Sequence, residues 1–492
     1  MAFVRIDGNE DFGYIALANI FVTKEIRMAC PPSTCRLLVW SAVFFAVTLL
    51  IPVEQIHAQT PRIQGQAAGA AGMGNAFAAQ ADDASALYYN PAGMTQLRGV
   101  HILTGALFVG GTTNFTSSST GQTTTGDRDG AVAWPPPAHL YIVANLKDIG
   151  FDALEKWTAG VGVTVPFGSL TRYPRENPFS TAVYYNTNPL LDIKPTVAYK
   201  LNDYLSFGLG ADIYTYSALF GEGQVEVMST GANNGLGPQF EINGSGTGAG
   251  FNASLLYTAL RNADGLPIAN IGLIYRSQAV VPLAGQFAIN GAIAADAHAN
   301  LVLPQIFGAG IAIWPVRDRE TEWKLELDVD YIGWTSFRDT TVSLSRPVPG
   351  IGSGIPVRQN WSNSYNVMIG TEYRLLKLDR WPDWEVALRA GFTQAQTQVP
   401  DATFNPGIPS SNVYTPGVGF GFTCKAGGSF FGLTKCGNLG LGSMKPKEIG
   451  LDISYQAAIY ETRSITGNVN PAVNGTYKTV FHAGGVALRF SY

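Results

Sequence analysis

Four charged residues with the spacing needed for joint chemistry lie in the second half of the chain. Lys324, Glu326, Asp328 and Asp330 occupy every second position, so in an extended strand they share one face. Three carboxylates in such a row could ligate a metal ion or act as a general acid and base. The lysine in the same row favours a network of ion pairs that lines a closed interior. We prefer this second interpretation, and we assign Arg389, from another alternating stretch, to the same network.

The other residues that commonly perform catalysis are not arranged for it. No histidine has the relation to a serine or an acidic residue that a nucleophilic triad needs. The histidines are His57, His101, His139, His298 and His482. We therefore predict that the protein is not an enzyme, has no catalytic residue, and uses no cofactor or metal ion.

The N-terminus carries the features of an export signal. Leu37–Val53 is the only long apolar run, it follows Arg36, and Ile56-His57-Ala58 resembles a small-residue cleavage site. An N-terminal membrane anchor is the alternative, but the run is short and Pro52 interrupts its end. We assign 1–58 to an N-terminal extension and signal peptide, which predicts export to the bacterial outer membrane.

Composition narrows the class of protein that follows the signal. Charged residues make up 14% of the 492 residues and the net charge is −4, whereas a soluble domain carries about a quarter charged residues. After the signal no run of about 20 apolar residues occurs, which excludes a helical membrane protein. The absence of a basic surplus argues against nucleic acid as a partner. Richness in Gly, Tyr and Phe fits a transmembrane β-barrel, where only alternate residues face lipid.

Alternation with period two recurs along the chain after about residue 100. A soluble sandwich would alternate too, but runs long enough to cross a bilayer, about 9–11 residues, and a terminal alternating strand, Val486–Tyr492, favour an antiparallel barrel. The candidate strands are roughly 100–115, 131–145, 157–166, 191–201, 204–220, 247–260, 269–289, 299–314, 323–344, 364–375, 384–397, 413–422, 447–460 and 480–492. We therefore predict an all-β fold of about 14 strands, an even number as in bacterial barrels.

Two cysteines of the exported chain lie where the alternation of loops fails. With both termini in the periplasm, long loops fall outside and short turns inside, except for the long segment 423–446 on the short side. Either the strand count shifts there, or the protein has a stapled periplasmic insertion. Cys424 and Cys436 are the only cysteines after the signal, and an even pair in an exported protein indicates a disulfide.

The stretch 65–98 is unlike the rest because glycines and alanines dominate it and the tripeptide Asn90-Pro91-Ala92 follows an acidic pair. Small side chains allow a backbone to pack closely inside another structure. A flexible leader is the alternative for the glycines, and a plain Asn-Pro turn is the alternative for the tripeptide. We predict that 59–98 is a plug inside a barrel formed by 99–492.

The same stretch resembles a known family. GMGNAFAAQADDASALYYNPAGM is similar to the N-terminal signature of the FadL/TodX family of outer-membrane transporters for hydrophobic compounds. Weaker matches follow in the family's order at Val165–Gly168, Lys194–Lys200, Leu205–Gly210, Ile274–Ser277, Leu303–Pro304, Tyr331–Phe337, Gly370–Tyr373 and Leu388–Gly391.

The resemblance implies a 14-stranded barrel with an N-terminal hatch in its lumen, and it partly guided the strand count. The hatch motif falls on Asn90, Pro91 and Ala92. A kink in the third strand, which opens the wall sideways in the family, falls on Pro166, Phe167 and Gly168. Proline lacks the N–H that a sheet needs, so Pro166 should interrupt pairing, and Gly168 should permit a sharp turn. An ordinary strand end at the rim is the alternative.

The resemblance implies passive uptake of hydrophobic molecules, either long-chain fatty acids or aromatic hydrocarbons, with hatch gating and lateral exit. No basic motif for a carboxylate transfers from the family, which favours neutral substrates; Arg172, Arg276 and Arg358 are candidate anion contacts or rim charges. The expected surroundings are outer-membrane lipid and lipopolysaccharide, with insertion as a monomer by the barrel assembly machinery. A structural barrel, or an adhesin or receptor that uses its long loops, is the alternative function.

Overall fold

The computed structural model describes residues 62–219, 223–438 and 446–492. The chain divides into two units, Met1–Glu54 and Gln55–Tyr492, and the described residues all belong to the second. The predicted N-terminal extension and signal peptide, 1–58, therefore lies outside the described residues.

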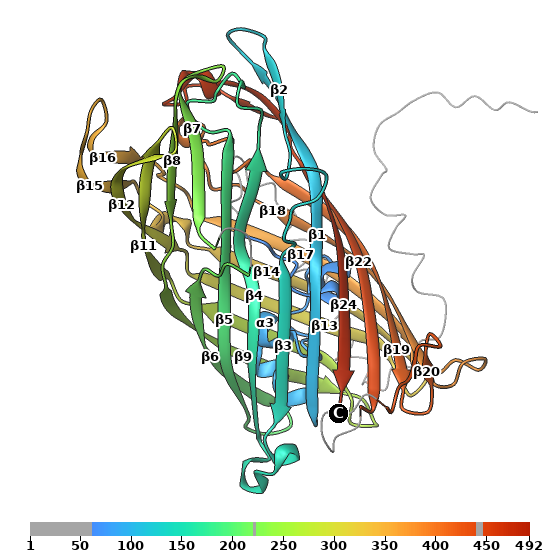
Figure 1. Ribbon diagram of the computed structural model, residues 1–492. Coiled ribbons are helices and arrows are strands. Elements are labelled where there is room, and N and C mark those ends of the chain that lie inside the picture. The colour runs from blue at the N-terminus through green and yellow to red at the C-terminus, as the bar shows by residue number, and fades with distance from the viewer. Residues whose placement is uncertain (1–61, 220–222, 439–445) are drawn as a thin grey trace, which may run out of the picture. The chain divides into compact units, whose positions relative to one another are not determined.

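The second unit is an antiparallel sheet whose strands close on themselves (Figure 1). Each neighbouring pair in the ring is antiparallel, and pairing of β24 with β1 from His101–Ser491 to Ser117–Gly475 closes it. In order around the ring the strands are β1 (Val100–Ser117), β3 (Ala138–Asn145), β4 (Trp157–Arg172), β5 (Tyr185–Lys200), β6 (Leu205–Thr215), β9 (Gly248–Arg261), β10 (Pro267–Arg276), β13 (Ile306–Arg317), β14 (Thr321–Ile332), β17 (Ser364–Leu375), β18 (Trp384–Ala395), β19 (Val413–Lys425), β22 (Glu448–Tyr460) and β24 (Gly475–Ser491). The predicted all-β antiparallel barrel is confirmed.

Further strands extend the wall beyond the ring at the end opposite the C-terminus (Figure 1). They are β2 (Thr123–Gly126), β7 (Val225–Ala232), β8 (Leu236–Gly244), β11 (Ala279–Ile289), β12 (Ala292–Leu303), β15 (Thr340–Val348), β16 (Gly352–Val357) and β23 (Arg463–Ile465). The predicted single strands 269–289 and 323–344 are each two strands in the structure. The reason is a change of partner, since β10 pairs with β13 while β11, just beyond it, pairs with β12 and β8.

The predicted strand 131–145 is also too long. β3 begins only at Ala138, after the run Trp134-Pro135-Pro136-Pro137. Three consecutive prolines supply no N–H to a neighbouring strand, so the alternation continues in the sequence where pairing cannot. This shortening leaves β1 and β4 without a full strand between them.

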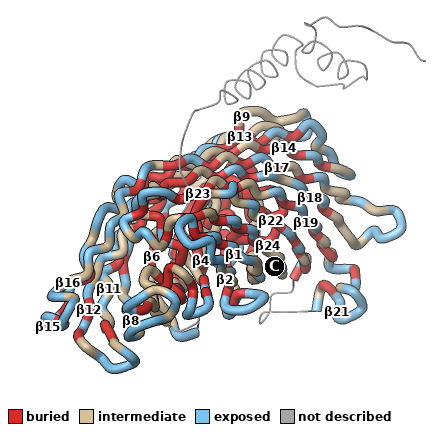
Figure 2. Tube along the Cα trace, turned by 90° about the horizontal axis from the view of Figure 1, so that it is seen from above, coloured by how far each residue is buried: buried red, intermediate tan, exposed pale blue. Residues whose placement is uncertain are grey.

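Buried and exposed residues alternate along the wall strands (Figure 2), as expected when successive side chains point to opposite faces of the sheet. On the outside of β9, β10, β13, β14 and β17 one aromatic row crosses the strands, with ring centroids 4.8 to 6.3 Å apart. The row consists of Phe251, Tyr275, Phe307, Tyr331 and Tyr365. Aromatic girdles of this kind flank the lipid-facing band of transmembrane barrels. Among the described residues no helix is both long enough and apolar enough to cross a membrane.

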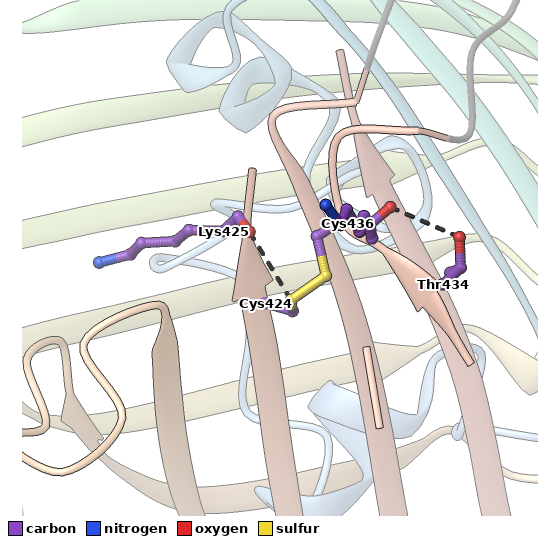
Figure 3. Close-up of a disulfide and its surroundings, with 5 residues drawn as sticks. Cys424, Lys425, Thr434 and Cys436 are labelled. Atoms are coloured by element: carbon purple, nitrogen blue, oxygen red, sulfur yellow. Dashed lines mark hydrogen bonds between the residues drawn. A yellow bond between two sulfur atoms is a disulfide. The ribbon is translucent and has the colours of Figure 1, made fainter. Parts of the chain in front are cut away.

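Residues 426–438 and 446–447 lie at the end of the barrel that holds the C-terminus, because the Lys447 N–H donates to the Ser491 carbonyl at 2.6 Å. They include the short hairpin of β20 (Ser429–Phe430) and β21 (Thr434–Lys435). Cys424, at the end of β19, is joined by a disulfide to Cys436, just after this hairpin (Figure 3). The ring is continuous here through β19 and β22, so the structure has a stapled insertion rather than a shifted strand count.

Residues 62–97, which we call the inner segment, are surrounded by the ring. They form α2 (Ala68–Gly72), α3 (Ala86–Tyr89) and the 3-10 helix η1 (Pro91–Gln96), and most of their side chains are buried. The small residues noted in the sequence bring this backbone against the wall, as expected for close packing. The remaining 3-10 helices lie in loops and are η2 (Lys147–Ile149), η3 (Asp152–Leu154), η4 (Trp334–Ser336), η5 (Asp401–Thr403) and η6 (Pro471–Val473).

Toward the end opposite the C-terminus the interior is apolar. Aromatic residues from strands and loops pack together there, with Phe115 and Phe179 4.9 Å apart and Phe404 and Tyr477 4.7 Å apart between ring centroids. The same buried cluster includes Phe167 of the predicted kink. The interior thus changes from apolar at this end to charged beside the inner segment.

Candidate functional site

Carboxylates of β14 bind the backbone of the inner segment. Glu326 accepts hydrogen bonds from the N–H groups of Ala79 at 2.6 Å and Gln80 at 3.2 Å. One oxygen of Asp328 accepts from two further N–H groups, of Phe77 and Ala78, both at 2.8 Å. These acceptors satisfy amides of an irregular segment that has no sheet partner of its own. The acidic row therefore has a structural task, which supports the interpretation as an interior lining.

Cations neutralise this row. The Nζ of Lys324 lies 2.8 Å from Glu326, and Arg62, at the start of the inner segment, lies 2.6 Å from Asp330. Both pairs are well shielded from solvent. A buried charge with a close opposite charge avoids the large cost of desolvation without a partner.

Arg389 of β18 lies between two acids, one on the adjacent strand β17 and one on β22, beyond β19 on the other side. Its guanidinium is 2.6 Å from Glu372 and 2.6 Å from Asp452. Arg374 is 2.7 Å from Glu372 and 3.2 Å from Asp82 of the inner segment. The sequence reasoning missed Glu372, Arg374 and Asp82 as members, although Glu372 and Arg374 alternate along β17 as the β14 row does.

A second buried charge cluster was not predicted. Lys194 of β5 is fully buried and pairs with Asp192 at 3.2 Å and with Asp212 of β6. Asn252 of β9 donates to the same Asp212 carboxylate at 2.9 Å. The alternation of Asp192 and Lys194 within the stretch LLDIKP is the signal that could have revealed it.

Asn90 connects the inner segment to itself and to the wall. Its side-chain amide donates to the Ala78 carbonyl at 2.7 Å and to the Leu255 carbonyl of β9 at 3.2 Å. Its oxygen accepts from the Ala92 N–H at 3.1 Å, which also donates to the Ser254 hydroxyl at 2.9 Å. Asn90 is fully buried, so the tripeptide is more than a surface Asn-Pro turn.

Replacing Asn90 with alanine should loosen the inner segment without preventing barrel assembly. The loss leaves buried carbonyl groups without donors, which costs about 1–3 kcal/mol. Hydrogen–deuterium exchange of 76–97 should therefore become roughly tenfold to a hundredfold faster. Asn114→Ala, at an exposed asparagine of β1, serves as the control and should leave exchange in 76–97 unchanged. Equal exchange in both variants would show that Asn90 does not hold the segment.

The wall is incomplete between β3 and β4. Their pairing runs from Asn145–Thr158 only to Leu140–Val163. Directly beyond, β4 has a bulge, because Thr164 pairs with Asp192 and the next paired residue, Phe167, pairs with Leu190. Pro166 lies in this bulge. A bulge bends its strand and disrupts the ladder.

Gly168 has a different role from the one predicted. It has no positive φ, so the bend does not depend on a left-handed glycine. A Cβ there would lie 3.2 Å from the Ile63 side chain and 3.1 Å from the Asn188 carbonyl. The glycine instead leaves room for the start of the inner segment.

The inner segment covers the free edge of β4. The Ile63 N–H donates to the Pro166 carbonyl at 2.9 Å. The Gln66 side chain pairs with the backbone of Val165 as a strand residue would, donating to its carbonyl at 3.0 Å and accepting from its N–H at 3.1 Å. Backbone groups that lost β3 as a partner are thus satisfied by residues of the inner segment.

A cavity of about 350 Å³ adjoins this edge. One side is the proline-rich run Trp134–Pro137, and the other is β4 from Gly168 to Thr171. Its inner wall includes Ala458 and Phe481 of β22 and β24. The cavity therefore lies between the barrel interior and the gap in the wall, and it is large enough for a small apolar ligand.

Comparison with known proteins identifies the family to which this barrel belongs. Residues 54–428 match the family described as outer membrane protein transport protein (OMPP1/FadL/TodX). The chain belongs to this family. Its outer-membrane barrel is thereby shown, and family members are transporters of fatty acids and hydrocarbons. The family consists of transport channels rather than enzymes.

Individual relatives are distant in sequence. A long-chain fatty acid transport protein of Salmonella typhi is 22% identical over 398 residues, covering 75% of this chain and 85% of the relative. A FadL homologue of Pseudomonas aeruginosa has a TM-score of 0.65 at 14% identity, covering 88% of this chain and all of that one. The toluene transporter TbuX of Ralstonia pickettii has a TM-score of 0.56 at 16% identity, covering 87% and 99%. Likeness at these identities establishes the shared fold.

Proposed function

We propose that this protein is a passive channel for the uptake of hydrophobic molecules, long-chain fatty acids or aromatic hydrocarbons, across the outer membrane. The inner segment acts as the hatch, and substrate leaves sideways through the gap between β3 and β4. The observation that carries the proposal is the pairing of Ile63 and Gln66 with the bulged edge of β4, beside the cavity. Displacement of the inner segment would at the same time open the barrel interior to substrate and uncover the edge of β4 at the gap.

The physical logic of lateral exit supports the proposal. An apolar molecule gains about 0.8 kcal/mol for each CH₂ that leaves water, so a path from an apolar cavity into lipid avoids the periplasm. The apolar interior around Phe115 and Phe179 lies toward the end opposite the C-terminus, and Phe481, which lines the cavity, lies close to it along β24. No energy source is required for movement down a gradient.

The relatives named above support the substrate class, since one is named for long-chain fatty acids and another for toluene. In this proposal the closed ring of about 14 antiparallel strands, from β1 to β24, crosses the membrane. The protein enters it as a monomer through the barrel assembly machinery, among outer-membrane lipid and lipopolysaccharide.

Uptake of radiolabelled oleate and toluene into a transporter-deficient host tests the function. Cells that express the protein should take up at least one of the two substrates several-fold faster than cells with an empty vector, at equal amounts of assembled barrel. Heat-modifiable migration in gels reports assembly. Entry of neither substrate above the vector level would refute transport of these compounds and leave the outer hairpins as a receptor or adhesive surface.

A further inference from the structure

The cavity beside the gap contains one buried cation without a partner. Arg128, from the loop between β2 and β3, lines the cavity and is only 7% exposed. Its Nε and Nη2 atoms have no hydrogen-bond partner among the described residues. The guanidinium lies 4.1 Å from the ring centroid of Phe481, a contact that fixes its position but does not neutralise its charge.

Among the described residues neither neighbouring acid forms an ion pair with Arg128, although the charge of Asp127 attracts it over a longer distance. Asp129, which also lines the cavity, forms an ion pair with Arg172. The carboxylate of Asp127 accepts the Gly130 N–H at 3.2 Å. Burial lowers the pKa of Arg128 to about 10, so its guanidinium is still protonated at neutral pH.

Two other buried arginines differ from Arg128 in having a carboxylate partner, whereas buried Arg276 instead donates to the Tyr88 carbonyl and lies over the Tyr88 ring. Arg62 and Arg389 each lie 2.6 Å from a carboxylate, as expected for charges that are withdrawn from water. A buried guanidinium without such a partner carries an uncompensated desolvation cost. In a cavity with mainly apolar walls, an anionic group on an otherwise apolar ligand would remove that cost.

We propose that Arg128 binds the carboxylate of an amphiphilic substrate whose hydrocarbon chain occupies the cavity at the gap. The inference rests on the proposed function and makes it more specific, since it favours monocarboxylates with a long apolar chain over neutral hydrocarbons. It revises the expectation from the sequence, in which no basic motif for a carboxylate transferred from the family and Arg172 was one of the candidate anion contacts. Arg172 is paired with Asp129 and half exposed, whereas Arg128 is buried and unpaired.

The chemistry at the guanidinium explains why a carboxylate fits. Arginine presents N–H donors in a planar fork that matches the two oxygens of a carboxylate. Phe481 covers one face of the fork, and apolar residues such as Val109 and Ile408 line the same cavity. The head group and the chain of one ligand would thus find separate surfaces in one cavity.

Binding of radiolabelled oleate and of its methyl ester to the purified protein in amphipol tests the assignment. The ester keeps the chain and removes the charge. Arg128→Gln should weaken oleate binding roughly tenfold or more, the usual loss for a charged hydrogen bond, and leave binding of the ester unchanged. Arg128→Lys, which keeps the charge, should retain part of the preference for oleate. Arg338→Gln, at an exposed arginine on the same end of the barrel, should match the wild type.

The outcomes separate this proposal from the proposed function. Equal oleate affinity in wild type and Arg128→Gln, or equal losses for oleate and ester, would overturn the role of Arg128. Absence of oleate binding to the wild type would overturn it as well. Uptake of oleate and toluene by cells is measured independently, so transport can stand when the Arg128 assignment fails.

Discussion

Alanine at position 391 is expected to displace the inner segment and turn a closed barrel into one that conducts ions. Gly391 faces the interior from β18, and a Cβ there would lie 2.0 Å from the carbonyl carbon of Met73 and 2.4 Å from the nitrogen of Gly74. Both are backbone atoms, so no side-chain rotation relieves the clash, and overpacking of this kind costs about 1–3 kcal/mol or more. Pairing of β18 with its neighbours does not involve the added methyl group. Planar-bilayer recordings should show a steady conductance well above that of the wild type.

Gly484→Ala is the matched control for this experiment. Gly484 also lies in a wall strand, β24, but nothing lies within 4 Å of the position that a Cβ would take. The control should assemble and remain closed. Unchanged conductance in an assembled Gly391→Ala variant would contradict the view that contact with the wall at this position holds the inner segment in place.

Deleting Pro166 is expected to abolish uptake while the barrel still assembles. Between Thr164 and Phe167 β4 advances three residues while β5 advances two, from Asp192 to Leu190, so β4 contains one residue too many for a regular ladder. Removing it restores the period of two without changing which face Thr164 and Phe167 occupy. A straight β4 can pair further with Ala138 and His139 of β3, which narrows the gap where Ile63 and Gln66 now bind, so uptake of the transported substrate should fall at least tenfold, to the level of the empty vector.

A second proline offers an unusually close control. Pro315 lies in an equivalent bulge of β13, where Ile313 pairs with Leu325 and the next paired residue, Val316, pairs with Trp323. This bulge is remote from β3, so deletion of Pro315 should also regularise a strand but leave uptake near the wild-type rate. If both deletions reduce uptake equally, the loss reflects damage to the barrel rather than closure of a lateral exit.

Local sequence patterns predicted the strands of the barrel wall better than they predicted the contacts of the candidate site. Alternation with period two put Lys324, Glu326 and Asp328 on one strand face, and the structure buries all three, because a strand sends successive side chains to opposite faces whatever it pairs with. The same rule failed where alternation continued through a change of pairing partner, as in 323–344, or through the prolines at 135–137. Alternation in the sequence predicts that a segment is extended, but it does not predict which strand the segment pairs with.

The site depends on partners that only the tertiary structure brings together. Gln66 meets Val165, and Arg389 meets Asp452, across separations of 99 and 63 residues. Arg128 stands out because two of its nitrogens have no hydrogen-bond partner among the described residues while the adjacent Asp129 pairs with Arg172. The sequence alone determined a charged, small-residue interior within an exported antiparallel barrel, since those properties follow from residue type and spacing. Which charges are paired, and which edge of the wall is left open, was decided by long-range packing, because pairing and burial depend on distances between segments far apart in the chain.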